Sequence, residues 1–182
     1  MKAIVAFPVF LVVVILDQIT KLVAEATLAA LPRPVFGEWL RFALVYNPGA
    51  AFGLHLGPYS RWIFMGLTAG ALYILGRLYQ QTAEQDHRRV LSIALVAAGA
   101  VGNVIDRIRS EYGVVDFIDI GFGAHRWPTF NVADIAVSSG AFLLAYVLWH
   151  EERREAELLA AASPGDSTNA SASAADSPDL VP

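Results

Sequence analysis

The sequence predicts an all-α integral membrane protein with four transmembrane helices. Of its 182 residues, 55% are hydrophobic and only 16% are charged, whereas about 25% of the residues of an ordinary soluble domain are charged. The uncharged residues gather in four uninterrupted runs of 14 to 16 residues, which are 3–16, 62–76, 90–105 and 135–149. Such runs are not expected in a disordered chain and are unusual in a soluble domain.

Each predicted helix extends one of these runs into its polar flanks, because about 20 residues are needed to cross the hydrocarbon core. The expected helices cover residues 3–24, 59–79, 88–109 and 129–150. Successive helices cross the membrane in opposite directions. The C-terminal ends of the first and third helices therefore share one face with the N-terminal ends of the second and fourth, and both long connections emerge there.

The first long connection, residues 25–58, contains a segment that is typical of a strand. Residues 39–46 alternate between apolar and less apolar side chains, which predicts a short strand or an interfacial element that cradles an extended peptide. The next residues, Asn47-Pro48-Gly49-Ala50-Ala51-Phe52-Gly53, favour a tight turn, and Asn47 can both donate and accept hydrogen bonds. An ordinary turn is the simpler interpretation of Gly49 and its neighbours.

The two ends of the chain carry their own patterns. Lys2, the first apolar run and Ala24-Glu25-Ala26 together resemble a cleaved signal peptide, but charged residues between the run and that site argue against this alternative. Residues 156–182 are rich in Ala, Ser, Asp and Pro, so we expect a disordered polar tail after a membrane domain of residues 1–155. Six basic residues on the side of the termini against five on the other side favour cytoplasmic termini only weakly.

Composition excludes several classes of function. The chain has no cysteine, and its four histidines show no paired spacing, so we expect no metal site, no thiol nucleophile and no cofactor. Its serines lack a nucleophile-elbow motif. Residues 1–149 hold 11 basic and 10 acidic residues without a basic stripe, which leaves nucleic-acid binding without support.

Polar residues at the ends of the first and third helices are candidates for a buried site. Asp17 and Lys21 are four residues apart and can pair on one helix face, either as a structural ion pair with Lys21 reaching the interface or as functional groups. In the segment 99–107, small residues permit close helix packing, and Asn103, Asp106 and Arg107 share a face. We expect Asp106 to be structural, in a charge cluster with Arg107 that neutralises itself.

Two further aspartates form the most informative pair. Asp116 precedes the fourth helix, and Asp134 lies in its first or second turn, close to Asn131. Two neighbouring carboxylates do not both ionise cheaply, so one keeps a proton while the other activates water, as aspartic proteolysis requires. Because a helix N-terminus favours an ionised Asp134, Asp116 is the expected proton carrier, although a coupled pair resists assignment to single residues.

Five ordered motifs resemble those of the bacterial lipoprotein signal peptidase family, signal peptidase II, over residues 5–150. They are Asp17-Gln-x-Thr-Lys21, Asn47-x-Gly-Ala-Ala-Phe52, Gly99-Ala-x-Gly-Asn-x-x-Asp-Arg107, Val114-Val-Asp-Phe117 and Phe130-Asn-x-Ala-Asp134. The resemblance implies an intramembrane aspartic endopeptidase that cuts diacylglyceryl-modified prolipoproteins immediately before the lipidated cysteine. It implies that Asp116 and Asp134 are catalytic. It also implies supporting roles for Asp17, Asn47, Asn103, Asp106, Arg107 and Asn131.

The resemblance further implies a bacterial inner or plasma membrane location with cytoplasmic termini and an active site and cradle on the extracytoplasmic side. The implied partners are lipidated prolipoproteins, membrane phospholipid and cyclic lipopeptide inhibitors of the globomycin type. Two other classes stay open on the residues alone. An ion-coupled transporter would need polar groups across the whole membrane, whereas these gather at one face. In a non-catalytic assembly protein the same cluster would be purely structural.

Overall fold

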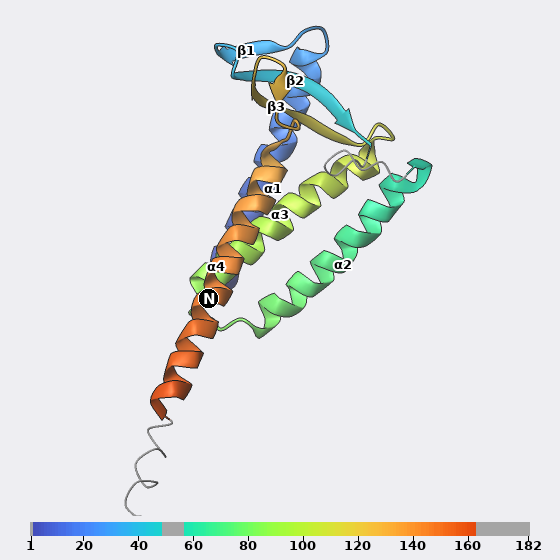
Figure 1. Cartoon of the computed structure of the whole chain (residues 1–182). Coiled ribbons are helices and arrows are strands. Elements are labelled where there is room, and N and C mark those ends of the chain that lie inside the picture. The colour runs from blue at the N-terminus through green and yellow to red at the C-terminus, as the bar shows by residue number, and fades with distance from the viewer. Residues whose placement is uncertain (1, 49–56, 163–182) are drawn as a thin grey trace, which may run out of the picture. The chain divides into compact units, whose positions relative to one another are not determined.

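The computed structural model describes residues 2–48 and 57–162. Within these residues, four long helices are present: α1 (Lys2–Leu28), α2 (Ser60–Gln81), α3 (His87–Arg109) and α4 (Val132–Ala162). Each of the four is long and apolar enough to cross a membrane (Figure 1). The prediction of four helices able to cross a membrane is thereby confirmed.

The ends of two helices differ from the prediction for physical reasons. α1 continues four residues past 24, because Ala24 and Leu28 are buried against Phe117 of the sheet. α4 continues through residues 151–162, whose Glu, Arg, Ala and Leu are strong helix formers. Residues 156–162 are thus helical where the sequence analysis expects the start of a disordered tail. The rest of that expected tail, residues 163–182, lies outside the described residues.

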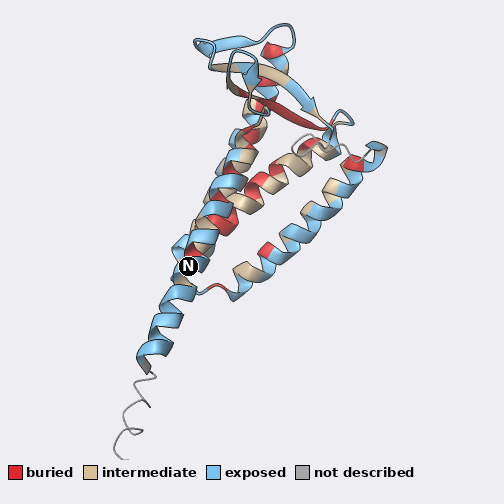
Figure 2. Cartoon of the chain, viewed as in Figure 1, coloured by how far each residue is buried: buried red, intermediate tan, exposed pale blue. Residues whose placement is uncertain are grey.

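The chain divides into two units, Met1–Val147 and Leu148–Pro182, and the boundary falls inside α4. In the first unit, α3 packs against both α1 and α2, and Figure 2 shows buried residues concentrated along α3 and β3. In the second unit, the guanidinium carbon of Arg153 lies 5.1 Å from the centre of the Trp149 ring, one helical turn away.

Glycines allow α3 and α4 to approach closely. A Cβ atom added to Gly99 of α3 would lie 2.3 Å from the carbonyl oxygen of Ala133, and one added to Gly140 of α4 would lie 2.8 Å from that of Ser92. Both distances are too short for any side chain. The small residues of segment 99–107 therefore do bring helices together, as the sequence predicts.

A four-stranded sheet lies beside the C-terminal end of α1 (Figure 1). Its strands are β1 (Arg33–Phe36), β2 (Leu40–Asn47), β3 (Val114–Phe122) and β4 (His125–Arg126), in the order β1-β2-β3-β4, with antiparallel neighbours. The predicted strand of the first connection is confirmed as β2. The second connection, residues 110–128, supplies β3 and β4. The segment that the sequence predicts as a short strand is therefore part of a four-stranded sheet.

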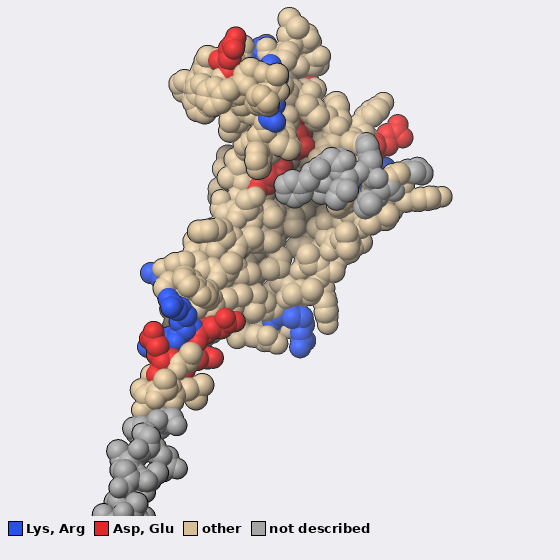
Figure 3. All heavy atoms as spheres, in the orientation of Figure 1, with Lys and Arg blue, Asp and Glu red and all other residues tan. Residues whose placement is uncertain are grey.

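The remaining surface of the helices is poor in charge. A broad band of uncharged surface crosses the helices below the sheet on the face shown in Figure 3. On α1 this surface includes Leu16, Ile19, Leu22 and Val23, all about half exposed. In water such exposure is costly, whereas in a bilayer it is the expected contact with lipid chains.

Candidate active site

A buried ion cluster joins α1 to α3. The Lys21 ammonium lies 2.8 Å from a carboxylate oxygen of Asp17 and 2.8 Å from one of Asp106, and all three side chains are fully buried. Lys21 also donates a 2.9 Å hydrogen bond to the side-chain oxygen of Asn103. The predicted Asp17–Lys21 pair is confirmed, but Lys21 does not extend to the interface. The ion pair of Asp106 is with Lys21 and not with Arg107, so the predicted charge cluster had the wrong partner.

The two carboxylates of this cluster hold the backbone beside both candidate catalytic residues. Asp17 accepts a 2.8 Å hydrogen bond from the backbone N–H of Ala133, and Asp106 accepts a 3.2 Å bond from that of Val115. These residues directly precede Asp134 and Asp116. The ion cluster therefore fixes where β3 and the start of α4 present their aspartates.

Asn131 caps α4 and connects the site. Its side-chain oxygen accepts a 2.9 Å hydrogen bond from the backbone N–H of Asp134, while its own backbone N–H donates to the Asp134 carboxylate at 3.2 Å. This reciprocal arrangement is a capping box. The Asn131 amide nitrogen donates to Asp116 at 2.7 Å and to the side-chain oxygen of Asn103 at 3.2 Å. One fully buried asparagine thus contacts both candidate carboxylates.

Asp134 is held as a hydrogen-bond acceptor at the start of α4. Its second carboxylate oxygen accepts a 2.9 Å hydrogen bond from the Asn103 amide of α3. With the bond from the Asn131 backbone, both of its oxygens are accepting. The positive end of the α4 dipole also lies at this turn. These three features favour the charged form of Asp134, whereas burial of the side chain opposes it.

Asp116 on β3 has a different environment. Its side chain is only 3% exposed and accepts hydrogen bonds from Asn131 and, at 3.2 Å, from Asn47 at the end of β2. Burial, reinforced by the negative charge of Asp134, raises the pKa of Asp116 from 3.8 to about 7, against the opposing effect of these two hydrogen bonds. Near neutral pH, Asp116 therefore still carries a proton for a substantial fraction of the time.

Both aspartates line one cavity of about 680 Å³. Its polar wall includes Asn47 and Arg107, and its apolar wall includes Phe64 and Ile135. The Arg107 guanidinium lies 5.7 Å from the centre of the Phe64 ring and donates to the backbone oxygen of Asn103 at 3.2 Å. The cavity thus offers two carboxylates, a guanidinium and an apolar surface in one place.

A neighbouring groove continues from this cavity along the helices. It is lined by Leu67 and Ala71 of α2, Val96 of α3 and Val137 of α4, and Arg107 and Asp134 line it as well. An apolar chain lying in this groove would reach the Asp134 carboxylate without leaving an apolar surface.

Most of the candidate residues from the sequence meet here. Asp17, Lys21, Asn47, Asn103, Asp106, Arg107, Asp116, Asn131 and Asp134 belong to one network or line its cavity, whereas Gly49 lies outside the described residues. The described residues contain no group of three metal-ligating side chains. Sequence reasoning missed Gln18, which donates to Asp17 at 3.2 Å and to Asp106 at 3.4 Å. Its position next to Asp17 in the first motif was the available signal.

Sequence reasoning also missed a second charged cluster on the sheet. Asp119 of β3 accepts hydrogen bonds from Arg41 of β2 and Arg126 of β4. Hydrogen bonds from these arginines outweigh the effect of burial and hold the pKa of Asp119 below its ordinary value. Only the register of β2 against β3, which places Arg41 opposite Asp119, reveals this cluster.

The chain is similar to known proteins over most of its length. A model of the family described as Signal peptidase (SPase) II matches residues 9–150. A protein of Burkholderia mallei (strain SAVP1) named Lipoprotein signal peptidase is 41% identical over 141 residues, covering 75% of this chain and 82% of that protein. A protein of the same name from Polynucleobacter necessarius subsp. necessarius (strain STIR1) is 40% identical over 152 residues, covering 79% and 86%.

Two solved structures share the fold. Both are described as bacterial membrane enzymes determined by the in meso method, one at 2.3 Å and one at 1.9 Å resolution. The first has a TM-score of 0.73 and 30% identity, covering 81% of this chain and 88% of that one. The second has a TM-score of 0.70 and 31% identity, covering 79% and 91%.

Proposed function

The chain belongs to the signal peptidase II family and is therefore a multi-pass membrane peptidase that removes signal peptides from prolipoproteins, and we propose that it is an aspartic endopeptidase with Asp116 and Asp134 as its catalytic pair. One observation carries this proposal. The two carboxylates line the same cavity and share Asn131, and burial together with the charge of Asp134 favours a proton on Asp116.

In the proposed reaction, the ionised Asp134 takes a proton from a water molecule as the water oxygen attacks the scissile carbonyl carbon. The protonated Asp116 donates its proton to the carbonyl oxygen, which gives a geminal diol. The C–N bond then breaks as Asp134 passes its proton to the leaving amine and Asp116 recovers one from a diol hydroxyl. Both residues return to their starting states, so no other proton donor is required.

The supporting residues position this pair. Asn131 and Asn103 hold the carboxylates by direct hydrogen bonds, and Asn47 holds Asp116 from β2. Lys21 and its two buried aspartates act one step further away, through the backbone of Val115 and Ala133. Arg107 is placed to hydrogen-bond a substrate carbonyl, because its guanidinium lines the cavity.

We further propose that the substrate is a diacylglyceryl-modified prolipoprotein, cut immediately before the lipidated cysteine. The apolar groove beside the cavity suits acyl chains or an apolar signal peptide that stay in the bilayer while the peptide bond meets water and the carboxylates. The proposed location is the bacterial inner or plasma membrane, with cytoplasmic termini, surrounding phospholipid, and the sheet and site on the extracytoplasmic side. Cyclic lipopeptides of the globomycin type would occupy the same cavity as the substrate.

The decisive experiment measures cleavage of a diacylglyceryl-modified lipobox peptide by the purified full chain in detergent. Asp116→Asn and Asp134→Asn are each expected to abolish cleavage while the protein stays inserted and monodisperse. Glu111→Gln, at an exposed turn away from the cavity, is the matched control and should retain full activity. Full activity in either aspartate variant would refute the catalytic assignment.

A further inference from the structure

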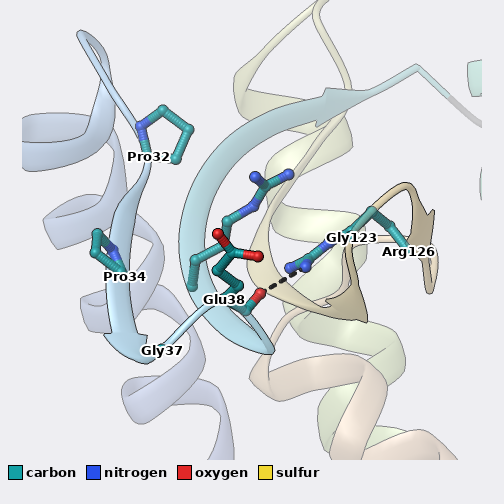
Figure 4. A pocket seen from close by; sticks show the side chains of 7 residues that line it. Pro32, Pro34, Gly37, Glu38, Gly123 and Arg126 are labelled. Atoms are coloured by element: carbon teal, nitrogen blue, oxygen red, sulfur yellow. Dashed lines mark hydrogen bonds between the residues drawn. The ribbon is translucent and has the colours of Figure 1, made fainter.

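A second pocket lies in the sheet, between two hairpin turns. It has a volume of about 380 Å³ and is lined by Pro32, Pro34, Gly37, Glu38, Arg41, Gly123 and Arg126. Figure 4 shows Glu38 and Arg126 between the segment that carries Pro32 and Pro34 and the turn at Gly123. Gly37 and Gly123 have φ angles of 56° and 54°, so both turns need the left-handed backbone that glycine favours. The pocket is therefore built by the backbone of both hairpins.

This pocket is separate from the catalytic cavity. Asp116 and Asp119 are three residues apart on β3, and successive side chains of a strand point to opposite faces. The Asp119 cluster, whose Arg41 and Arg126 line this pocket, thus faces away from Asp116. The two cavities share none of their lining residues.

Arg41 gives the pocket one positively charged group whose terminal nitrogens still have N–H donors to offer. Asp119 holds the Nε atom of Arg41, and within the described residues the two terminal nitrogens of Arg41 make no hydrogen bond. All three nitrogens of the Arg126 guanidinium donate hydrogen bonds, to the Asp119 carboxylate and to the backbone oxygens of Glu38, Gly121 and Asp119. A guanidinium held at Nε points its other two nitrogens outward as a fork, which is the geometry that binds phosphate.

The pocket also presents an anion. The Glu38 backbone is fixed by Arg126 at 2.8 Å, while its carboxylate accepts no hydrogen bond from the described residues. With Asp119, the two carboxylates balance the two guanidiniums, so the pocket is neutral overall. A simple anion would be repelled by Glu38, whereas a ligand that carries a phosphate and an ammonium group would satisfy both free groups.

The end of α1, which packs against the sheet, would lie at the depth of lipid headgroups in a bilayer. The last large exposed apolar residue of α1 is Val23, and α1 ends at Leu28, which is about 7.5 Å further along the helix axis. The headgroup region adds about 5 to 8 Å to each side of the hydrocarbon core. Phe36 and Trp39, which flank the Gly37–Glu38 turn, are 61% and 43% exposed and stack at 6.1 Å, as interfacial aromatic residues do.

We propose that this sheet pocket binds the headgroup of a phospholipid that carries both a phosphate and a primary ammonium, with the phosphate on Arg41 and the ammonium on Glu38. The proposal concerns a lipid that is not a substrate, because the reaction proposed above needs no phosphate. It does not depend on the catalytic roles of Asp116 and Asp134, so either proposal can fail without the other.

The test is native mass spectrometry of the full-length protein in detergent, titrated with dioleoyl phosphatidylethanolamine or dioleoyl phosphatidylglycerol. We expect wild type to retain one phosphatidylethanolamine molecule more tightly than phosphatidylglycerol. Glu38→Gln should weaken phosphatidylethanolamine retention about threefold to fivefold, as expected for a partly exposed ion pair, and should remove the preference. Arg41→Lys, which keeps the charge but loses the fork, should weaken both lipids.

Glu111→Gln and Arg88→Lys are matched controls at exposed positions outside the pocket and should bind as wild type does. Peptidase activity and thermal stability of each variant show that it remains folded. Equal retention of the two lipids by wild type, or an unchanged preference in Glu38→Gln, would overturn the proposal. Displacement of the lipid by an equal concentration of inorganic phosphate would also overturn it, in favour of a free-anion site.

Discussion

Replacing Asp116 by asparagine should stabilise the protein at neutral pH while it removes activity. The folded-state pKa of Asp116 lies near 7, above the value of 3.8 for an unperturbed carboxyl. A group whose pKa is raised on folding contributes its full stability below its unfolded pKa and loses it as the pH rises to the folded pKa. The stability that this residue confers below about pH 4 is therefore lost by about pH 7.

The size of the effect follows from the shift. About three pKa units at about 1.36 kcal/mol each give a loss of about 4 kcal/mol between pH 4 and pH 7 as an upper bound. Asparagine keeps the shape of the carboxyl without the charge, so Asp116→Asn should lack this loss. Asp119→Asn is the matched comparison, because Asp119 lies on the same strand and is also 3% exposed. Since the pKa of Asp119 is lowered on folding, its contribution is present at neutral pH, and Asp119→Asn should destabilise there.

The assay is thermal unfolding of the purified variants across about pH 4 to 8 at constant detergent and salt. Wild type should lose stability as the pH rises relative to Asp116→Asn, and the two should converge at the acid end. If Asp116→Asn and wild type show the same pH dependence, Asp116 is ionised in the folded protein, and the proton-sharing account of the site is wrong.

Three other outcomes are expected. The kcat/KM for the lipobox peptide should fall above about pH 7, because Asp116 loses its proton there. Asn47→Ala should move that fall to higher pH, because it removes a hydrogen bond that lowers the pKa of Asp116. Initial rates at several pH values measure both effects. Lys21→Met should destabilise the fold by about 3 to 5 kcal/mol, because it leaves two buried carboxylates without their cation. Folded yield and thermal unfolding measure this loss, and a variant as stable as wild type would contradict it. Gly99→Ala should lower the free energy of unfolding by about 1 to 3 kcal/mol, because the added methyl group overlaps the Ala133 backbone. Gly70→Ala should leave the stability unchanged or slightly higher, because no atom lies within 4 Å of the added methyl group. Equal thermal stability of the two variants would refute this reasoning.

Much of the site could be predicted because its residues follow from helix geometry. The spacing of Asp17 and Lys21 fixes their pairing on one helix face, and alternate crossing of the membrane brings Asn103 and Asp134 to the same end. Neither inference needs knowledge of how the helices pack. The four apolar runs are equally local signals, so the number of helices was predictable as well.

The ion-pair and packing partners that lie on different helices and strands were not predictable. Asp106 pairs with Lys21 because α3 packs on α1 with a particular rotation, which periodicity does not determine. The end of α1 depends on burial of Leu28 under the sheet, and the Asp119 cluster depends on strand register. These features arise from tertiary contacts, which override the local preferences that a sequence pattern expresses.

The capping role of Asn131 has a consequence for biogenesis. The same side chain that starts α4 also orients both aspartates, and its geometry relies on Asn103 and on the cluster around Lys21. A partly inserted chain that lacks its last membrane helix has Asp116 without Asp134. In a chain whose α1 has not docked, the backbone at Val115 and at Ala133 is not held in place by the ion cluster. With the catalytic pair proposed above, peptidase activity therefore arises only when the last helix has joined the first three.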